Sequence, residues 1–435
     1  MENEQKYPNP LIVGDYVEKN DFEKAQNYSA TDSGSWIHFT DQAQMSTQGR
    51  YFEVKPLIAE FVTTHLCNFG CPTCSRRMLR ETWLGSESTW GKDGQDVIPH
   101  TRNTISLREM KIIVDQLANN GVKAVVWGGG EPTLNRDIYE GISFAKERGM
   151  YCSLITNGSI FNEPGISKIL NHGIDLIRVS LNCATPEKHA SFHGYSHKKN
   201  YFNQVVNNIR RIAEIKNSTG AITDYGISVI LDNKNIDEIN ALVNLLYEIV
   251  NPFNKSPIDF LVLRSVYNYY GSFGHIDEKT YQTYESINID QAFSKLADCG
   301  MKIVIPKSDS LKEKSDCALE KPHWQCLGYG WCTEIHPSGD MFICSDAYGN
   351  PEYVIGNLLR EEFNNIWFGE KRRLVLENIN KNNCLTNYCP FTGRGHHLNR
   401  IFNQIEDIKS SDFAKLDEWM LLLEQLTSRK IPFYL

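Results

Sequence analysis

The sequence predicts an α/β protein in which a partial barrel of six parallel strands precedes a smaller C-terminal domain. Between residues 57 and 264, short apolar and β-branched runs alternate with longer segments whose apolar residues recur about every 3.6 positions. After about residue 300 this alternation stops, and short strand-like runs lie among clustered cysteines. Strands that alternate with helices form a parallel sheet, and right-handed crossovers curl that sheet. We therefore expect a partial (β/α)6 TIM-like barrel.

Six strands and five helices account for the alternating region. The predicted strands span residues 57–63, 123–127, 151–156, 174–181, 225–231 and 258–264. The predicted helices span residues 107–119, 136–148, 166–171, 202–215 and 236–249. The carboxyl ends of parallel strands meet at one rim, where barrels of this kind carry their chemistry.

The chain divides into four predicted parts. Residues 1–54 are rich in Asn, Asp, Gln and Ser, which predicts a partly ordered polar arm. Residues 55–300 form the barrel, and residues 301–397 form a small domain with strands at 301–305 and a hairpin within 333–343. Residues 398–435 are expected to form a C-terminal helical segment.

Composition narrows the class of protein. The formal charge of −8 argues against nucleic acid as a partner, because phosphate neutralisation needs clustered Lys and Arg. The short basic run 371–373 is expected on a solvated face. No apolar run approaches the ~20 residues of a membrane span, and the first twenty residues lack the pattern of a secretion signal. We therefore expect a cytoplasmic protein with no membrane partner, in which the twelve cysteines serve as metal ligands or reactive thiols rather than disulfides.

Three cysteines directly follow the first predicted strand. Cys67, Cys71 and Cys74 have the spacing C-x3-C-x2-C. Three thiolates this close can hold three irons of a [4Fe–4S] cube and leave the fourth iron open to a small chelating molecule. A zinc site is the alternative, but its four ligands usually come as two pairs, and no fourth Cys or His follows at that spacing.

Glycines and polar residues follow the other strands of the predicted rim. Gly128-Gly129-Gly130-Glu131-Pro132 comes after the second strand, where glycine lets the backbone approach a ligand and proline stiffens the turn. Ser180 and Asn182 end the fourth strand, either as ligand contacts or as a polar strand cap. Arg264 closes the sixth strand and could bind a ligand or form a surface ion pair.

On these residues the chain resembles the radical S-adenosylmethionine (SAM) superfamily, whose signature is three cysteines at this spacing with a GGE-P loop after the next strand. The resemblance implies a reduced cluster that cleaves SAM to methionine and a 5′-deoxyadenosyl radical, which abstracts a substrate hydrogen. It also implies an external one-electron reductant of the flavodoxin or ferredoxin type. The glycine loop with Glu131 would bind the ammonium group of SAM, and Ser180 and Asn182 would contact its ribose or carboxylate. The family usually has an aromatic residue before the third cysteine, but Thr73 stands here, which leaves the adenine contact to Phe69 or another residue.

A second cysteine group lies in the small domain. Cys326 and Cys344 flank a predicted hairpin in the pattern C-x12-G-x4-C, with Gly339 at the turn. This pattern resembles the auxiliary-cluster module called SPASM, or its shorter form twitch, and implies one auxiliary [4Fe–4S] cluster completed by Cys384 and Cys389. A structural zinc at these four positions is the alternative, and His396 and His397 are possible replacement ligands.

The sequence leaves the outcome of hydrogen abstraction open. A dehydrogenase or cross-linking enzyme needs an electron acceptor, whereas an epimerase needs a thiol that returns a hydrogen. Cys183, beside the fourth strand, and Cys332, on the hairpin and able to face the barrel mouth, are the candidate donors, although buried cysteine is often only a small hydrophobe.

The N-terminal arm bears on which class of substrate the protein takes. No winged-helix-like module for gripping a leader peptide is apparent there, which favours dehydrogenation or epimerisation of a small metabolite of the sugar, aminoglycoside or nucleoside type. The alternatives are a ribosomal-peptide maturase that forms a cross-link or a D-residue, and a non-catalytic zinc-stabilised scaffold.

Overall fold

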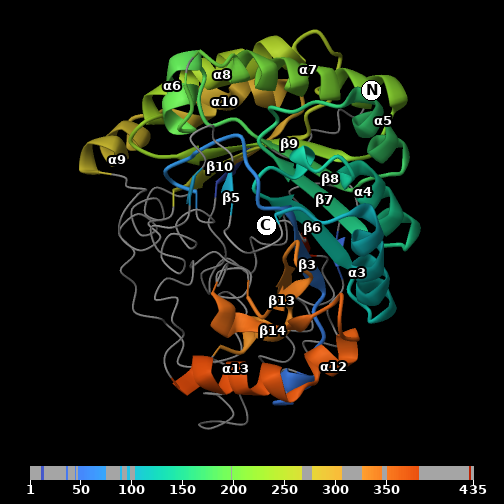
Figure 1. The fold of residues 1–435 in the computed structure, drawn as a ribbon. Coiled ribbons are helices and arrows are strands. Elements are labelled where there is room, and N and C mark those ends of the chain that lie inside the picture. Colours follow the sequence, from blue (N-terminus) through green and yellow to red (C-terminus); the bar gives the residue numbers. More distant parts are fainter. Residues whose placement is uncertain are drawn as a thin grey trace, which may run out of the picture.

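The computed structural model describes residues 48–74, 103–196, 198–266, 277–305, 326–344 and 350–381, with short strands at Leu11–Val13, Trp36–Ile37, Thr89–Trp90, Asp96–Val97 and Ile431–Pro432. An open, curved sheet forms its centre, and helices follow the outer side of that sheet (Figure 1). Most of the predicted polar arm and of the predicted C-terminal helical segment lies outside the described residues.

The sheet has eleven strands in the order β1-β11-β10-β9-β8-β7-β6-β3-β12-β13-β14. Neighbours are parallel from β1 to β12 and antiparallel in the two pairs beyond. The strands are β1 (Leu11–Val13), β3 (Ile58–Thr64), β6 (Ala124–Gly129), β7 (Tyr151–Thr156), β8 (Leu176–Ser180), β9 (Asp224–Leu231), β10 (Phe260–Ser265), β11 (Lys302–Ile305), β12 (Cys332–Ile335), β13 (Asp340–Phe342) and β14 (Val354–Asn357). The predicted partial barrel is confirmed, and its six predicted strands are β3 and β6 to β10.

The helices of the described residues are α3 (Leu107–Asn119), α4 (Ile138–Glu147), α5 (Glu163–Asn171), α6 (Pro186–Phe192), α7 (Tyr201–Thr219), α8 (Ile239–Val250), α9 (Glu278–Glu285), α10 (Ile289–Asp298), α12 (Phe363–Trp367) and α13 (Glu370–Lys381). The five predicted helices correspond to α3, α4, α5, α7 and α8. Helix α6 was not expected, because its seven residues are too few to show an amphipathic period.

Two strands lie where the sequence did not place them. Strand β1, from the segment expected to be a polar arm, pairs in parallel with β11. Strand β11, from the segment assigned to the small domain, pairs in parallel with β10 and so extends the barrel sheet. Three- and four-residue strands are too short to predict a sheet partner from sequence alone.

Helix α3 illustrates why the barrel helices form where they do. Ser106 and Glu109 form a capping box at its start. Four residues at helical spacing, Met110, Ile113, Val114 and Leu117, are buried against the sheet. Inside that layer, Phe61 of β3 stacks on Trp127 of β6 with 5.3 Å between ring centroids, which fixes the two strands that carry the candidate site.

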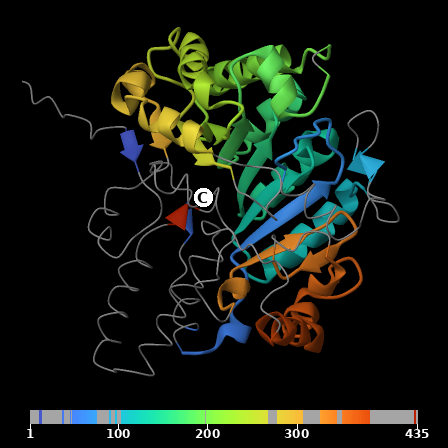
Figure 2. The same cartoon turned by 90° about the vertical axis from the view of Figure 1, so that its left-hand side faces the viewer.

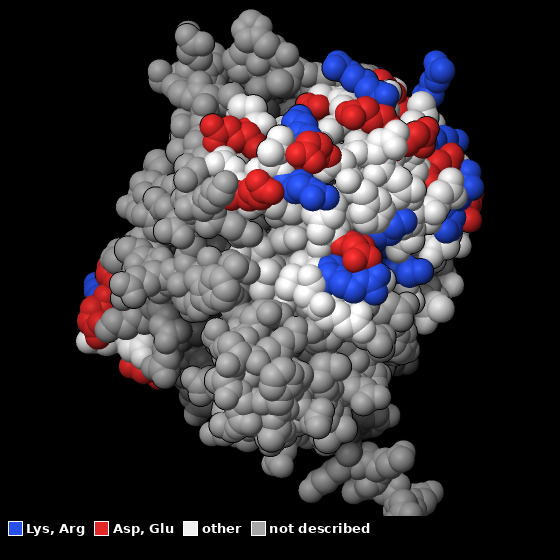
Figure 3. Space-filling view, turned by 90° about the horizontal axis from the view of Figure 1, so that it is seen from below, with Lys and Arg blue, Asp and Glu red and all other residues white. Residues whose placement is uncertain are grey.

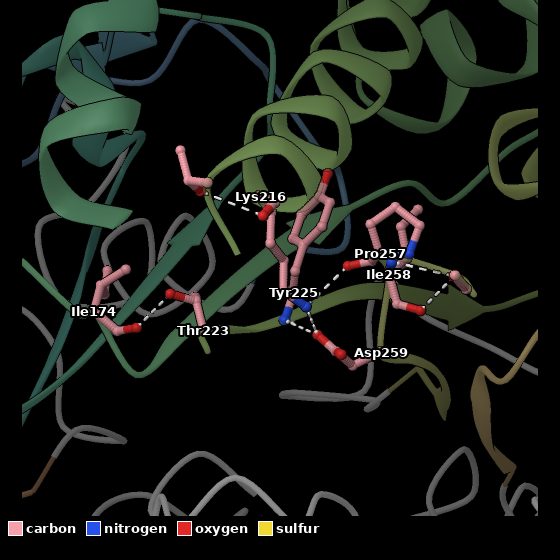
Figure 4. Close-up of polar contacts among 9 residues, drawn as sticks. Ile174, Lys216, Thr223, Tyr225, Pro257, Ile258 and Asp259 are labelled. Carbon is pink, nitrogen blue, oxygen red and sulfur yellow. Dashed lines mark hydrogen bonds and ion pairs between the residues drawn. The ribbon is translucent and has the colours of Figure 1, made fainter. Parts of the chain in front are cut away.

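At the other end of the strands, polar side chains hold the barrel together (Figure 4). The Lys216 ammonium of α7 donates to the carbonyl of Pro257 at 3.0 Å and pairs with the carboxylate of Asp259. That carboxylate also accepts the backbone N–H of Tyr225 at 2.7 Å. These contacts join α7, β9 and the start of β10 at the rim opposite to the cysteine loop.

The small domain continues the same sheet. Strand β12 pairs in parallel with β3, with Cys332 opposite Ile58 and Ile335 opposite Phe61. Strands β13 and β14 follow, and α12 and α13 lie beside them below the barrel (Figures 1 and 2). The predicted hairpin turn is confirmed, with Gly339 at φ +86°.

On the face seen in Figure 3, Lys and Arg side chains of the described residues intermingle with Asp and Glu. Within the described ranges, no helix has the length and apolar character that a membrane crossing requires.

Candidate functional site

The three cysteines of the first motif lie in the loop that leaves the carboxyl end of β3. All three are half-buried, and the N–H of Cys74 donates to the carbonyl of Cys71 at 3.2 Å. Burial and then the neighbouring Cys71 raise the pKa of the Cys67 thiol well above its usual value, and Glu131 and Cys74 add to this rise. The thiols are therefore close enough to repel one another as thiolates, and a bound metal must displace their protons.

This donor set fits an iron–sulfur cube. Three thiols from one loop can each bind a different iron, which leaves the last iron without a protein ligand from that loop. Within the described ranges, no three or more His, Cys, Asp or Glu side chains converge as ligands of a single metal ion do.

The glycine loop after β6 is pressed against the cysteine loop. The N–H of Gly130 donates to Thr64 and that of Glu131 to Leu66, both at 2.8 Å. A Cβ at Gly130 would stand 2.2 Å from the Leu66 carbonyl oxygen, and one at Gly129 would stand 2.4 Å from that of Thr64. Close approach therefore requires glycine at these two positions.

Gly128 differs from the two glycines that follow it. A Cβ at this position would meet no atom of the described residues within 4 Å. Backbone at Gly128 thus borders open space at the carboxyl end of β6, next to the cysteine loop, where a ligand of the cluster could lie.

The carboxylate of Glu131 is turned into the protein, with only 1% of the residue exposed. It accepts hydrogen bonds from the Thr133 hydroxyl at 2.6 Å and its N–H at 3.1 Å, from the Thr156 hydroxyl at 2.6 Å, and from the N–H of Asn157 at 2.7 Å. Burial raises the pKa of this carboxyl, and these donors lower it in part. Four protein donors thus hold the carboxylate in place, and the pairing with a SAM ammonium stays a prediction from the motif.

A second set of contacts ties the cysteine loop to the end of β7. Asn157 donates from its side-chain amide to the Asn68 oxygen at 2.9 Å, and Asn68 donates to the Ser159 hydroxyl at 2.7 Å. The Asn157 oxygen accepts from the N–H and hydroxyl of Ser159. The chain turns directly after Asn157, where Gly158 has φ +70°. The sequence did not identify Asn68 and Ser159, although Asn68 lies inside the cysteine motif.

Aromatic and histidine rings support the cysteine loop from the side of α6. Phe69, 1% exposed, packs against Tyr195 at 5.1 Å and His193 at 4.8 Å between ring centroids. His189 bonds through Nδ1 to the Tyr195 hydroxyl at 2.6 Å, and burial lowers its pKa to about 4. Burial of the Phe69 ring favours another residue for the predicted adenine contact.

His193 contacts a candidate ligand directly. Its Nδ1 lies 3.0 Å from the Cys71 sulfur, and burial holds the pKa of the ring well below its usual value. Gly194, next to it, has φ +63°, and a Cβ there would stand 2.2 Å from the Gly70 carbonyl oxygen. The sequence did not single out His193, because 122 positions separate it from Cys71.

The remaining predicted rim residues lie at or near strand ends as expected, and the side chain of one of them, Asn182, bonds the protein's own backbone. Asn182 is 4% exposed, and its side-chain oxygen accepts the N–H of Ile230 at 2.7 Å. Ser180 ends β8 and Arg264 lies near the end of β10, both half-buried. Pro132 is buried at the start of a short 3₁₀ helix, Pro132–Leu134.

Neither candidate hydrogen donor lies at the rim surface. Cys183 has no exposed area, and burial raises the pKa of its thiol. Cys332 is half-buried but pairs with Ile58, six residues before the carboxyl end of β3. At about 3.3 Å per residue, this places Cys332 roughly 20 Å from the rim. The expectation that Cys332 faces the barrel mouth is therefore wrong, because the hairpin strand runs parallel to β3 and starts at its far end.

Two of the predicted auxiliary-cluster ligands flank the hairpin. Cys326 and Cys344 are half-buried, and Glu334 pairs with Phe342 across the hairpin. Cys384, Cys389, His396 and His397 lie outside the described residues.

A buried arginine lies in the same part of the small domain. Arg372 has no exposed area, although the sequence placed this basic run on a solvated face. Its guanidinium lies 3.9 Å from the Trp367 ring centroid and donates to the carbonyls of Phe52 at 2.9 Å and Trp367 at 2.7 Å. Burial lowers its pKa to about 10.

Two family models match the chain. Residues 61–246 match the radical SAM superfamily, and residues 326–390 match the iron-sulfur cluster-binding domain SPASM.

Several curated proteins resemble part of the chain. Fe-coproporphyrin III synthase of Methanosarcina barkeri is 28% identical over 148 residues, 34% of this chain and 34% of that protein. PqqA peptide cyclase of Granulibacter bethesdensis is 32% identical over 125 residues, 29% of this chain and 28% of that protein. The PqqA peptide cyclase of Rhizobium meliloti is 25% identical over 182 residues, 42% of this chain and 41% of that protein. The matched region thus spans well under half of each relative's length.

Among solved structures, SuiB of Streptococcus suis bound to its precursor peptide SuiA has a similar fold. Its TM-score is 0.54 at 14% identity, over 83% of this chain and 77% of that one.

Proposed function

We propose that this radical SAM enzyme, whose barrel is followed by a SPASM iron–sulfur domain, modifies a peptide from which it abstracts a hydrogen atom. Its cofactors are a SAM-binding [4Fe–4S] cluster, SAM and auxiliary iron–sulfur. Three thiols on one loop, packed against a glycine loop that borders open space, support hydrogen abstraction at this rim. PqqA peptide cyclases among the relatives support a peptide over the small metabolite that the sequence favoured.

Each group at the rim has a proposed task. Cys67, Cys71 and Cys74 would hold the SAM-binding cluster, and Cys326, Cys344, Cys384 and Cys389 would hold one auxiliary cluster. When bound, cluster and SAM supply the 5′-deoxyadenosyl radical that removes a hydrogen atom from the substrate.

The protein itself holds in place the loops that border the open space beside Gly128. Glu131 draws Thr133, Thr156 and Asn157 together and so holds the glycine loop at the end of β7. We propose that the backbone at Gly128 lies against SAM, because a ligand beside the cluster meets no side chain there. Ser180 and Arg264 remain candidates for contacts with SAM or substrate. An external one-electron reductant of the flavodoxin or ferredoxin type would supply the electron.

Modification of a small metabolite is the second candidate function. Fe-coproporphyrin III synthase, a relative whose name specifies a small-molecule product, favours it.

The first experiment tests SAM cleavage by the cluster, which both candidate functions share. The enzyme is purified anaerobically and reduced in the presence of SAM. We expect about eight irons per chain, as two four-iron cubes require, and release of 5′-deoxyadenosine. Cys67→Ala should abolish that release. Cys152→Ala is the matched control, because it removes a buried thiol from the start of β7. Release that survives Cys67→Ala refutes the cluster assignment.

The substrate is tested separately by mass spectrometry. Short peptides encoded beside the gene are incubated with enzyme, SAM and reductant. Loss of two hydrogens indicates a cross-link, and deuterium uptake from deuterated water without that loss indicates epimerisation. If no peptide changes while a small metabolite does, the peptide proposal is wrong and the second candidate stands.

A further inference from the structure

His193 is held against the cysteine loop by two separate contacts. Its ring nitrogen Nδ1 lies 3.0 Å from the Cys71 sulfur. Its backbone carbonyl accepts the N–H of Gly70 at 2.8 Å. The residue is only 2% exposed, so bulk water does not compete for either contact.

We propose that His193 is a positioning residue that donates a hydrogen bond from Nδ1 to the Cys71 sulfur of the bound cluster and so raises the cluster's reduction potential. This inference rests on the proposed function, which makes Cys71 a cluster ligand. An iron-bound thiolate has no proton to donate, so the shared proton belongs to the histidine. Hydrogen bonds to sulfur help to set cluster potentials, and an N–H dipole stabilises the more negative, reduced state.

The second ring nitrogen supports this tautomer. Nε2 of His193 is buried and has no hydrogen-bond partner in the part of the chain that the structure describes. A proton on Nε2 would leave a buried donor unpaired, which costs about 1–3 kcal/mol, whereas a proton on Nδ1 is used by Cys71.

Neighbouring rings prevent His193 from turning away. Its ring centroid lies 4.3 Å from that of His189 and 4.8 Å from that of Phe69. The left-handed turn at Gly194 presses the following backbone onto Gly70. The Nδ1 atom therefore faces the sulfur before any cluster binds, so little reorganisation is needed.

The unsubstituted holoenzyme provides the first test. The protein is labelled with ¹⁵N-histidine, reconstituted, reduced and studied by pulsed electron paramagnetic resonance. The signal of the SAM-binding cluster is identified by its change when SAM is added. We expect a ¹⁵N hyperfine coupling on that signal, and its absence overturns the proposal.

Matched variants provide the second test, with the midpoint potential as readout. His193→Phe keeps a ring and removes the donor, whereas His193→Asn keeps an N–H near the position of Nδ1. His189→Phe is the control, because His189 bonds Tyr195 rather than a cysteine. We expect His193→Phe to disfavour reduction at least tenfold, a negative shift of about 59 mV for one electron, and the other two variants to stay near wild type.

The outcomes separate this role from the proposed function. A His193→Phe potential equal to that of wild type overturns the role of His193 alone. If His193→Phe assembles no cluster, the ¹⁵N coupling of the unsubstituted enzyme decides. If the wild-type protein assembles no cluster at Cys67, Cys71 and Cys74, both proposals fail.

Discussion

Replacing Gly130 by alanine should separate the glycine loop from the cysteine loop. The added Cβ would stand 2.2 Å from the Leu66 carbonyl oxygen, closer than any relaxed contact allows. Relief requires a backbone shift that breaks the two 2.8 Å hydrogen bonds from Gly130 and Glu131. Two such bonds contribute about 1 kcal/mol each, and overpacking adds about 1–3 kcal/mol, so the expected cost is about 3–5 kcal/mol.

Gly128→Ala is the control for this experiment. Its Cβ meets nothing within 4 Å, so the free energy of unfolding should change by less than about 0.5 kcal/mol. The assay is the urea unfolding midpoint of the apoprotein, together with iron bound per chain after anaerobic reconstitution. Gly130→Ala should lower both, whereas Gly128→Ala should lower neither and instead weaken SAM binding. Equal midpoints and iron contents in the two variants would refute the idea that the two loops are locked together.

Three further predictions use other parts of the structure. Cys183→Ala should leave the rate of product formation unchanged and cost about 1 kcal/mol in unfolding, because this thiol is fully buried; a loss of product would contradict that. Burial raises the pKa of Glu131 above its unfolded value, so the native state holds this proton longer, and stability should fall as pH rises between the two values. In Glu131→Gln this fall of stability with pH should vanish, and unfolding midpoints measured across pH would reveal the difference. If the midpoints of wild type and variant follow parallel curves against pH, Glu131 does not cause the fall. Lys216→Met should cost about 1–3 kcal/mol, less than a fully buried pair because Asp259 is partly exposed, while SAM cleavage persists at the opposite rim.

The barrel could be predicted because each of its strands and helices has a recognisable pattern of residues within its own segment. Strand β9, for example, is buried along seven of its eight residues, and five of the eight are aromatic or aliphatic. Helix α3 has a capping box and a buried stripe at helical spacing. Strand β1, with three residues, carries no such signal, and its partner β11 lies almost three hundred positions away.

The candidate site was predictable only where its residues are contiguous. The cysteine loop and the glycine loop each form a short motif whose chemistry follows from residue type and spacing. The links between motifs could not be predicted, because Asn68 meets Ser159 across 91 positions and Cys71 meets His193 across 122. Such pairs depend on which strand ends become neighbours at the rim, and that is a property of the sheet order.

The misplacement of Cys332 shows how strand direction decides function. A hairpin cysteine between two candidate ligands could face either end of the barrel, and sequence spacing does not distinguish the two. Because β12 runs parallel to β3, Cys332 starts at the level of Ile58, while the cysteine loop leaves β3 after Thr64. Cys332 therefore lies roughly 20 Å along the strand from the end of β3 that carries Cys67. Direction of pairing, rather than spacing in the sequence, thus decides that Cys332 and the cysteine loop lie at opposite ends of β3.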